Sequence, residues 1–178
     1  MIKKKYSSNQ YISKNEKIID IENIFNDFLG YELFFVNSSL GAIYLTLLFL
    51  KQKGLITNKN DEILVPEQMA LNYYNTINHV AFPSTYYSEN IKGIIVYHQN
   101  GFSQNMETIM RSAVKNNQFI IEDCSESLIS YVNGKRLGTF TNFAIFDLSK
   151  YFNNLWRNNF NQRKNFFKFY FKIAKNNI

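Results

Sequence analysis

The stretch KGIIVYHQNGFSQNMETIMRSAVKNNQFIIED, residues 92–123, predicts a strand, a helix and a second strand. Residues 92–98 and 118–123 contain short apolar runs of the kind that are buried on both faces of a parallel sheet. Between them, residues 105–117 place apolar side chains at helical spacing, with polar residues on the opposite face. The apolar positions are Met106, Ile109, Met110 and Ala113. Such a unit forms a right-handed crossover between parallel strands.

Ionisable residues stand at the carboxyl ends of the predicted strands. His98 and Asp123 end the two strands of the central unit, and Lys150 follows a further strand predicted at 142–148. Open parallel sheets carry their chemistry at this edge. We therefore expect the three ionisable groups to converge there.

Elements on the N-terminal side predict a three-layer α/β/α sandwich with a mostly parallel sheet. Strands are predicted at 32–36, 61–66 and 82–87, a weaker helix at 67–80, and a small hairpin around Asn133-Gly134. Two further helices are predicted from their apolar stripes: one with Ile21, Ile24, Phe25, Phe28 and Leu29 after Asp20, and one with Leu40, Ile43, Tyr44, Leu47 and Leu48 after Ser38-Ser39. The serine-rich start of the second helix is either an ordinary cap or an anion site.

The basic charge of the chain is concentrated at its C-terminal end. Of the net charge of +6, all comes from residues 151–178, which hold six basic residues and no acid. We expect an N-terminal arm (1–19), a domain (20–150) and a basic, aromatic helical tail (151–178). The tail pattern fits docking on a protein, contact with an anionic membrane surface, or a poorly ordered end. Since residues 1–150 are neutral overall, no nucleic-acid partner is expected.

Composition limits the compartment and the metal chemistry. The single cysteine, Cys124, cannot form an internal disulfide, which fits a cytoplasmic protein. No uncharged apolar run reaches the length of a membrane-spanning helix. The two histidines, His79 and His98, have no second ligand at metal-binding spacing, so no metal site is predicted.

Four motifs resemble the large domain of the DegT/StrS-type aminotransferases. In this family, His-x-x-Gly, a Met/Asp-rich helix, Ile-Glu-Asp-Ala-x-Gln and Lys-Gly-x-x-Val-Gly-Thr-Phe follow one another. The matching stretches here, in the same order, are His98-Gln99-Asn100-Gly101, the helix from Met106 to Ile109, Ile121-Glu122-Asp123-Cys124 and YVNGKRLGTF at 131–140. Weaker similarity at 37–48 and 61–66 extends the resemblance over roughly residues 20–150.

The resemblance implies a fold-type-I large domain that uses pyridoxal 5'-phosphate (PLP) to aminate keto-sugar nucleotides with an amino donor. It makes Asp123 the carboxylate at the pyridine nitrogen, Lys150 the Schiff-base lysine, and Ser38, Ser39 and the backbone of Leu40 the phosphate site. These residue types suit the chemistry, which needs an amine, a carboxylate and anion-binding donors. A homodimer, or a partner chain that completes the sheet, is also implied.

The chain departs from the family pattern at the phosphate site. Asp147 stands where the family has a phosphate-binding serine, and Leu40 stands where it has a threonine. A segment with a strand and a helix is missing between Tyr87 and Ile91. No second half of the large domain follows Lys150, so we expect an incomplete, truncated enzyme. The alternative is a catalytically inactive relative or fragment that acts, if at all, as an interaction protein.

Overall fold

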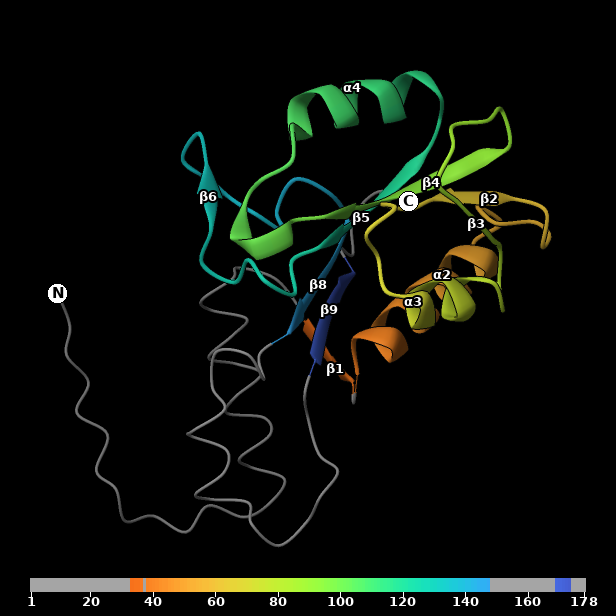
Figure 1. Cartoon of the computed structure of the whole chain (residues 1–178), viewed down its shortest axis with the longest axis horizontal. Helices are drawn as coiled ribbons and strands as arrows, with labels where there is room; N and C mark the ends of the chain where they lie inside the picture. Colours follow the sequence, from red (N-terminus) through yellow and green to blue (C-terminus); the bar gives the residue numbers. More distant parts are fainter. Residues whose placement is uncertain (1–32, 37, 148–168, 174–178) are drawn as a thin grey trace, which may run out of the picture.

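The computed structural model describes residues 33–36, 38–147 and 169–173. Within these residues, a seven-stranded sheet has the order β1-β9-β8-β5-β4-β2-β3 (Figure 1). Strands β3, β2, β4, β5 and β8 run parallel, and β9 is antiparallel to both of its neighbours, β8 and β1. The bounds are β1 Leu33–Val36, β2 Glu62–Leu64, β3 Phe82–Ser84, β4 Ile91–Tyr97, β5 Phe119–Asp123, β8 Phe143–Asp147 and β9 Phe169–Ile173.

Helices cover both faces of the sheet, which confirms the three-layer α/β/α prediction. Figure 1 shows α2 (Ser39–Gln52) and α3 (Leu71–Ile77) on one side, and α4 (Met106–Lys115) on the other. A short 3-10 turn, η1 (Gln99–Gly101), follows β4, and β6 (Tyr131–Val132) and β7 (Lys135–Arg136) form the predicted hairpin. No helix within the described residues has the length and apolarity that crossing a membrane requires.

The two faces have separate apolar cores, and strand alternation decides which residues enter each. Ile95, Ile121 and Ile145 pack under α2 and α3. Val96 and Ile120, one residue away in each strand, pack under α4. The predicted stripe of α2 is confirmed at Ile43 and Leu47 but is wrong at Tyr44 and Leu48, which are 37% and 38% exposed. The helix is apolar nearly all round, so apolar spacing alone does not single out its buried side.

The predicted C-terminal helix is wrong where the structure describes it. Residues 169–173, Phe-Tyr-Phe-Lys-Ile, form strand β9 between β8 and β1. Aromatic and β-branched residues favour strands, and the unpaired edge of β8 offers a complete set of backbone partners. The rest of the predicted tail helix lies outside the described residues, as does the predicted helix that contains Ile21–Leu29.

One connection between parallel strands lacks a helix, and this leaves part of the sheet uncovered. Helix α2 links β1 to β2, α3 links β2 to β3, and α4 links β4 to β5. The β3–β4 connection, residues 85–90, contains no helix. The α4 face of β2 and β4 therefore lacks the covering helix that a crossover usually supplies.

Asp61 closes the turn before β2 and supports a prediction on acid stability. Its Oδ2 accepts from the Thr57 N–H, the Thr57 hydroxyl at 2.8 Å and the Asn58 N–H at 3.2 Å. Burial raises the pKa of this carboxyl, but the hydrogen bonds from Thr57 and Asn58 outweigh it and hold the pKa below 3.8. The ionised form is thus the one that stabilises the fold.

We expect Asp61→Ala to lower the free energy of unfolding by about 2 kcal/mol at neutral pH, because the donors of Thr57 and Asn58 lose a charged acceptor that is itself buried. A depressed folded-state pKa gives stability that is present above the unfolded pKa and is lost as the pH falls through the folded value. The difference from wild type should therefore shrink below about pH 4 in urea titrations. If Asp61→Ala lowers the free energy of unfolding by the same amount at about pH 2 as at neutral pH, this account is contradicted. The control is Glu89→Ala, a change at an exposed carboxylate.

Candidate functional site

Three polar side chains end three adjacent strands on the same face of the sheet. Tyr97 ends β4 and lies beside Asp123, which ends β5, and Asp147 ends β8, which pairs with β5. Residues two positions earlier in β5 and β8, Ile121 and Ile145, lie in the core under α2 and α3. Because side chains alternate along a strand, Asp123 and Asp147 face the same helices. Both carboxylates are buried, at 2% and 6% exposure.

The start of α2 lies on this face and is joined to α3. Ser38 is the N-cap, and its side chain accepts from the Gly41 N–H at 2.9 Å. The Tyr73 hydroxyl donates to Ser39 Oγ at 2.6 Å. Since Ser39 is an acceptor in that bond, its own hydroxyl hydrogen remains able to donate to a further acceptor. The first-turn N–H groups, including that of Leu40, take no partner within the helix.

The pKa shifts of Tyr73 and Tyr97 indicate that their hydroxyls lie near the carboxylates of this site. Burial, followed by the charge of Asp123, raises the pKa of Tyr73 to about 12, with further contributions from Asp147 and Glu126 against the opposing Ser39 hydrogen bond. The pKa of Tyr97 is raised as well, first by burial and then by its hydrogen bond to Glu126 and the charges of Glu126 and Asp123. Both phenols therefore stay protonated at neutral pH and act as donors toward a carboxylate-rich space.

The turn after β5 fixes the position of Asp123. Its Oδ1 accepts from the Ser125 N–H at 3.0 Å. The Ser127 hydroxyl donates to the His98 carbonyl at 2.9 Å, and Glu126 accepts from the Asn100 N–H at 2.7 Å. These bonds tie the end of β5 to the loop that follows β4. The orientation of Asp123 is thus set by two neighbouring strand ends.

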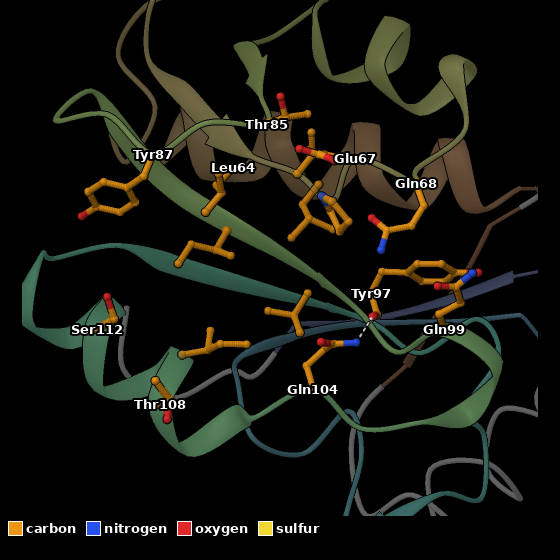
Figure 2. Close-up of a pocket in the computed structure, with 16 residues that line it drawn as sticks. Leu64, Glu67, Gln68, Thr85, Tyr87, Tyr97, Gln99, Gln104, Thr108 and Ser112 are labelled. Atoms are coloured by element: carbon orange, nitrogen blue, oxygen red, sulfur yellow. Dashed lines mark hydrogen bonds between the residues drawn. The ribbon is translucent and has the colours of Figure 1, made fainter.

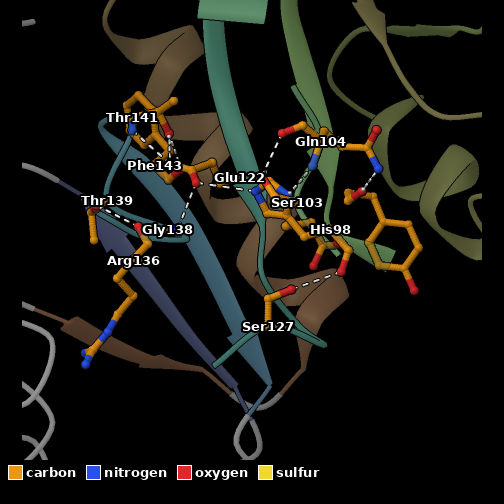
Figure 3. A network of polar contacts seen from close by, with 12 residues as sticks. His98, Ser103, Gln104, Glu122, Ser127, Arg136, Gly138, Thr139, Thr141 and Phe143 are labelled. Atoms are coloured by element: carbon orange, nitrogen blue, oxygen red, sulfur yellow. Dashed lines mark hydrogen bonds and ion pairs between the residues drawn. The ribbon is translucent and has the colours of Figure 1, made fainter. Parts of the chain in front are cut away.

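His98 does not take part in this site, and the predicted convergence with Asp123 is wrong for its side chain. The imidazole is fully buried, and its Nε2 lies 3.4 Å from Oε2 of Glu122 (Figure 3). Its Nδ1 accepts from the Gln104 N–H at 3.3 Å, so Nε2 carries the proton and donates to the carboxylate. Glu122 precedes Asp123 and therefore points to the α4 face.

Glu122 ties this face of the sheet to the segment before β8. Its oxygens accept from the Gly138 N–H at 2.7 Å, the Thr141 N–H at 2.8 Å and the Thr141 hydroxyl at 3.0 Å (Figure 3). The ligand atoms of His98, Glu122 and Cys124 lie within 4.8 Å of one another, a combination that suits a metal ion. Four donors already engage the Glu122 oxygens, so we assign the group to fold stability.

The structure places the predicted site residues as follows. Ser38, Ser39 and Leu40 lie at the start of α2 and Asp123 at the end of β5, all at the carboxyl edge. Lys150 lies outside the described residues. Tyr97 and Tyr73 were not predicted. Strand register and alternation signal Tyr97, because it precedes the loop at the same level as Asp123; the sequence carries no comparable signal for the contact of Tyr73 with Ser39.

Three comparisons with known proteins bear on this geometry. Residues 75–151 match the model of the DegT/DnrJ/EryC1/StrS aminotransferase family. A GDP-perosamine synthase of Escherichia coli O157:H7 is 30% identical over 129 residues, which cover 62% of this chain and 34% of that protein. The chain thus spans about a third of the length of that curated relative.

Solved structures share the fold at low sequence identity. A GDP-4-keto-6-deoxymannose-3-dehydratase, ColD, with bound GDP-perosamine has a TM-score of 0.70 at 17% identity, over 90% of this chain and 44% of that one. The PLP form of a putative sugar aminotransferase of Streptococcus pneumoniae has a TM-score of 0.67 at 16% identity, over 88% of this chain and 45% of that one. These likenesses confirm the expected fold-type-I architecture over part of the longer chains.

Proposed function

We propose that the carboxyl edge of this sheet holds PLP and serves the amination of a keto-sugar nucleotide, because residues 75–151 match the model of the DegT/DnrJ/EryC1/StrS aminotransferase family. The observation that carries the proposal is the link through Tyr73. Its hydroxyl donates to Ser39 at the start of α2, while its pKa responds to the charge of Asp123 at the end of β5. The start of α2 and a buried carboxylate therefore lie near one another, which supports the proposal because PLP has a phosphate at one end and a pyridine nitrogen at the other.

Each residue has a stated role in the proposal. Asp123 holds the pyridine nitrogen in its protonated form, and PLP, when bound, supplies an electron sink to the substrate. The α2 start, with Ser38, Ser39 and the Leu40 N–H, binds the phosphate through hydroxyl and backbone donors. Lys150, three residues beyond Asp147, holds the cofactor and moves the proton at its Nζ.

The residues of the candidate site fit the pyridine end of PLP better than its phosphate end. Asp123 is buried and held by Ser125, so its orientation is fixed before the cofactor arrives. At the other end the helix start offers donors, but Asp147 adds a buried negative charge on the same face of the sheet. Like charges repel strongly where water is excluded. The proposal therefore implies weak cofactor retention in the wild-type chain.

The substrate class is inferred from the relatives. The E. coli relative is a GDP-perosamine synthase, and ColD was solved with GDP-perosamine. We infer a GDP-linked keto sugar with an amino-acid donor as the substrates, and a homodimer in the cytoplasm as the working form. Surface-polysaccharide precursor synthesis is the role that such substrates support.

The test is cofactor binding followed by covalent mapping. Purified protein mixed with excess PLP should show a near-visible absorption band, and borohydride reduction followed by peptide mapping should place the cofactor on Lys150. Lys150→Ala should lose the band and the labelled peptide, while Lys135→Ala, a change at an exposed lysine, should keep both. Asp123→Asn should alter the band without moving the label. Label spread over surface lysines, with no specific band, contradicts the proposal.

A second candidate is a catalytically inactive relative that acts through protein contacts. The buried Asp147 on the face of the phosphate site is the observation that favours it. It predicts a folded protein by circular dichroism that binds no PLP, in the wild type and after Asp147→Ser alike. Any PLP specifically bound to Lys150 rejects this candidate.

A further inference from the structure

A groove runs along β4 beside α4, where the β3–β4 connection supplies no helix. It encloses about 490 Å³ and has an apolar floor and wall: Leu64, Ile94, Val96 and Ile109. Figure 2 shows Tyr87 and Ser112 at one end, and Gln68, Gln99 and Gln104 toward the other, near Tyr97. Three of the four apolar side chains are only half-buried. This is the sheet surface that a crossover helix normally covers.

The groove suits a helix with one apolar side. Ile94 and Val96 are two residues apart in β4, so their side chains form a row about 7 Å long between the α4 wall and the 85–87 segment. A helix that packs beside α4 on a sheet presents a stripe of large aliphatic and aromatic side chains. The groove lining is otherwise uncharged except for Glu67, so a charged ligand finds no partner on the floor.

The sequence contains a segment with this pattern outside the described residues. Residues 20–29, DIENIFNDFL, place Ile21, Ile24, Phe25, Phe28 and Leu29 on one side at helical spacing. A helix of this length is about 14 Å long, which is enough to cover the row. Its polar side carries Asp20, Glu22 and Asp27 and no basic residue.

Charge is complementary between this segment and the rim of the groove. Arg111 and Lys115 lie three residues after Thr108 and Ser112, which line the groove, and so flank it on the outer side of α4. Arg111 forms an ion pair with Glu107 at 2.7 Å, but both side chains are largely exposed, so the pair contributes little free energy. Lys115 is exposed as well. Acidic side chains on the segment would face these two cations.

The same chain cannot place the segment there. The described chain resumes at Leu33 in β1, and β1 is separated from β4 by β9, β8 and β5. Four strand spacings amount to about 19 Å. Four residues from Leu29 to Leu33 extend at most about 14 Å, which is shorter than this separation. We therefore propose that residues 20–29 of a second copy lie in this groove as a helix, reciprocally in a dimer.

Disulfide trapping tests the placement. Ser112→Cys on the groove rim and Asn26→Cys on the flank of the segment are made in separate copies with different tags, and Cys124 is buried in both. Mixing and mild oxidation should give a disulfide between the two tagged copies. Asn75→Cys in exposed α3 replaces Ser112→Cys as the control and should give at least tenfold less product. Product equal to this control overturns the proposal, as does a purely intrachain disulfide in the double variant.

Solution mass provides an independent readout with matched variants. Ile109→Glu, in the groove wall, should reduce the dimer fraction at least tenfold by light scattering. Val114→Glu on the same helix should leave it unchanged, because Val114 is 82% exposed and outside the groove. Phe25→Glu, in the docking segment, should also dissociate the dimer and gives a second variant if Ile109→Glu does not fold. A monomeric wild type, or a dimer that survives Phe25→Glu, overturns the proposal.

Discussion

Glu122→Ala is expected to lower the free energy of unfolding by about 3–5 kcal/mol, the cost of breaking a buried charged network at one member. The Glu122 carboxylate is fully buried and accepts from four groups: the Gly138 N–H, the Thr141 N–H, the Thr141 hydroxyl and His98 Nε2. Alanine leaves the Gly138 N–H, the Thr141 N–H and His98 Nε2 without this acceptor, and each orphaned donor costs free energy. The Thr141 hydroxyl keeps the Phe143 carbonyl as an acceptor at 2.9 Å. Since domains of this size are stable by about 5–15 kcal/mol, the variant should lose a large share of its stability.

Urea unfolding followed by circular dichroism measures this effect. Glu107→Ala is the matched control, because Glu107 also pairs with a cation but is 80% exposed at the side chain. Glu107→Ala should lower the free energy of unfolding by less than about 0.5 kcal/mol. A loss below about 1 kcal/mol for Glu122→Ala contradicts the stabilising role that we assign to the network.

Asp147→Ser is expected to increase PLP affinity by about a hundredfold. Two unit charges about 8 Å apart interact by about 2 kcal/mol at an effective dielectric constant of 20, and a phosphate carries nearly two charges. Removing the buried carboxylate from the face that holds Ser39 thus removes repulsion worth two or more factors of ten. The serine also adds a hydroxyl donor where the family has one.

Two control variants separate the effect of removing the Asp147 charge from the effect of adding a serine hydroxyl. Asp147→Asn removes the charge without the serine hydroxyl and should recover most of the gain. Glu126→Gln removes a neighbouring acid that is partly exposed and should change PLP affinity by less than tenfold. Equilibrium titration of the absorption band gives each dissociation constant. Unchanged affinity in both Asp147 variants means that Asp147 does not limit cofactor binding.

The central unit was predictable because its pattern and its structure obey the same rules. Residues 92–123 became β4, α4 and β5 with bounds shifted by one or two residues. The side-chain placement of His98 was not predicted, because position at a strand end does not say which face a residue beyond the strand turns to. Strand alternation does decide the face within a strand. Glu122 and Asp123 are neighbours in β5, yet Glu122 binds His98 on the α4 face and Asp123 lies on the α2 face.

The prediction of a helical tail was wrong at residues 169–173 for a different reason. Lysine spacing in residues 158–178 fits a helix, but Phe169–Ile173 is also a sequence of strand formers. Local pattern cannot choose between the two, since the choice depends on whether a sheet edge is open. That edge belongs to β8, so the decision rests on tertiary structure.

Strand β9 also has a consequence for biosynthesis. Leu33 in β1 pairs with Lys172 in β9, and β1 has no other strand neighbour among the described residues. Such pairing between distant parts of a chain gives a high contact order, which slows folding. On the ribosome, β2 to β8 can assemble as they emerge, whereas β1 waits until residues 169–173 have been translated. Until then β8 exposes an unpaired edge, and we expect nascent chains to be prone to aggregation at this stage.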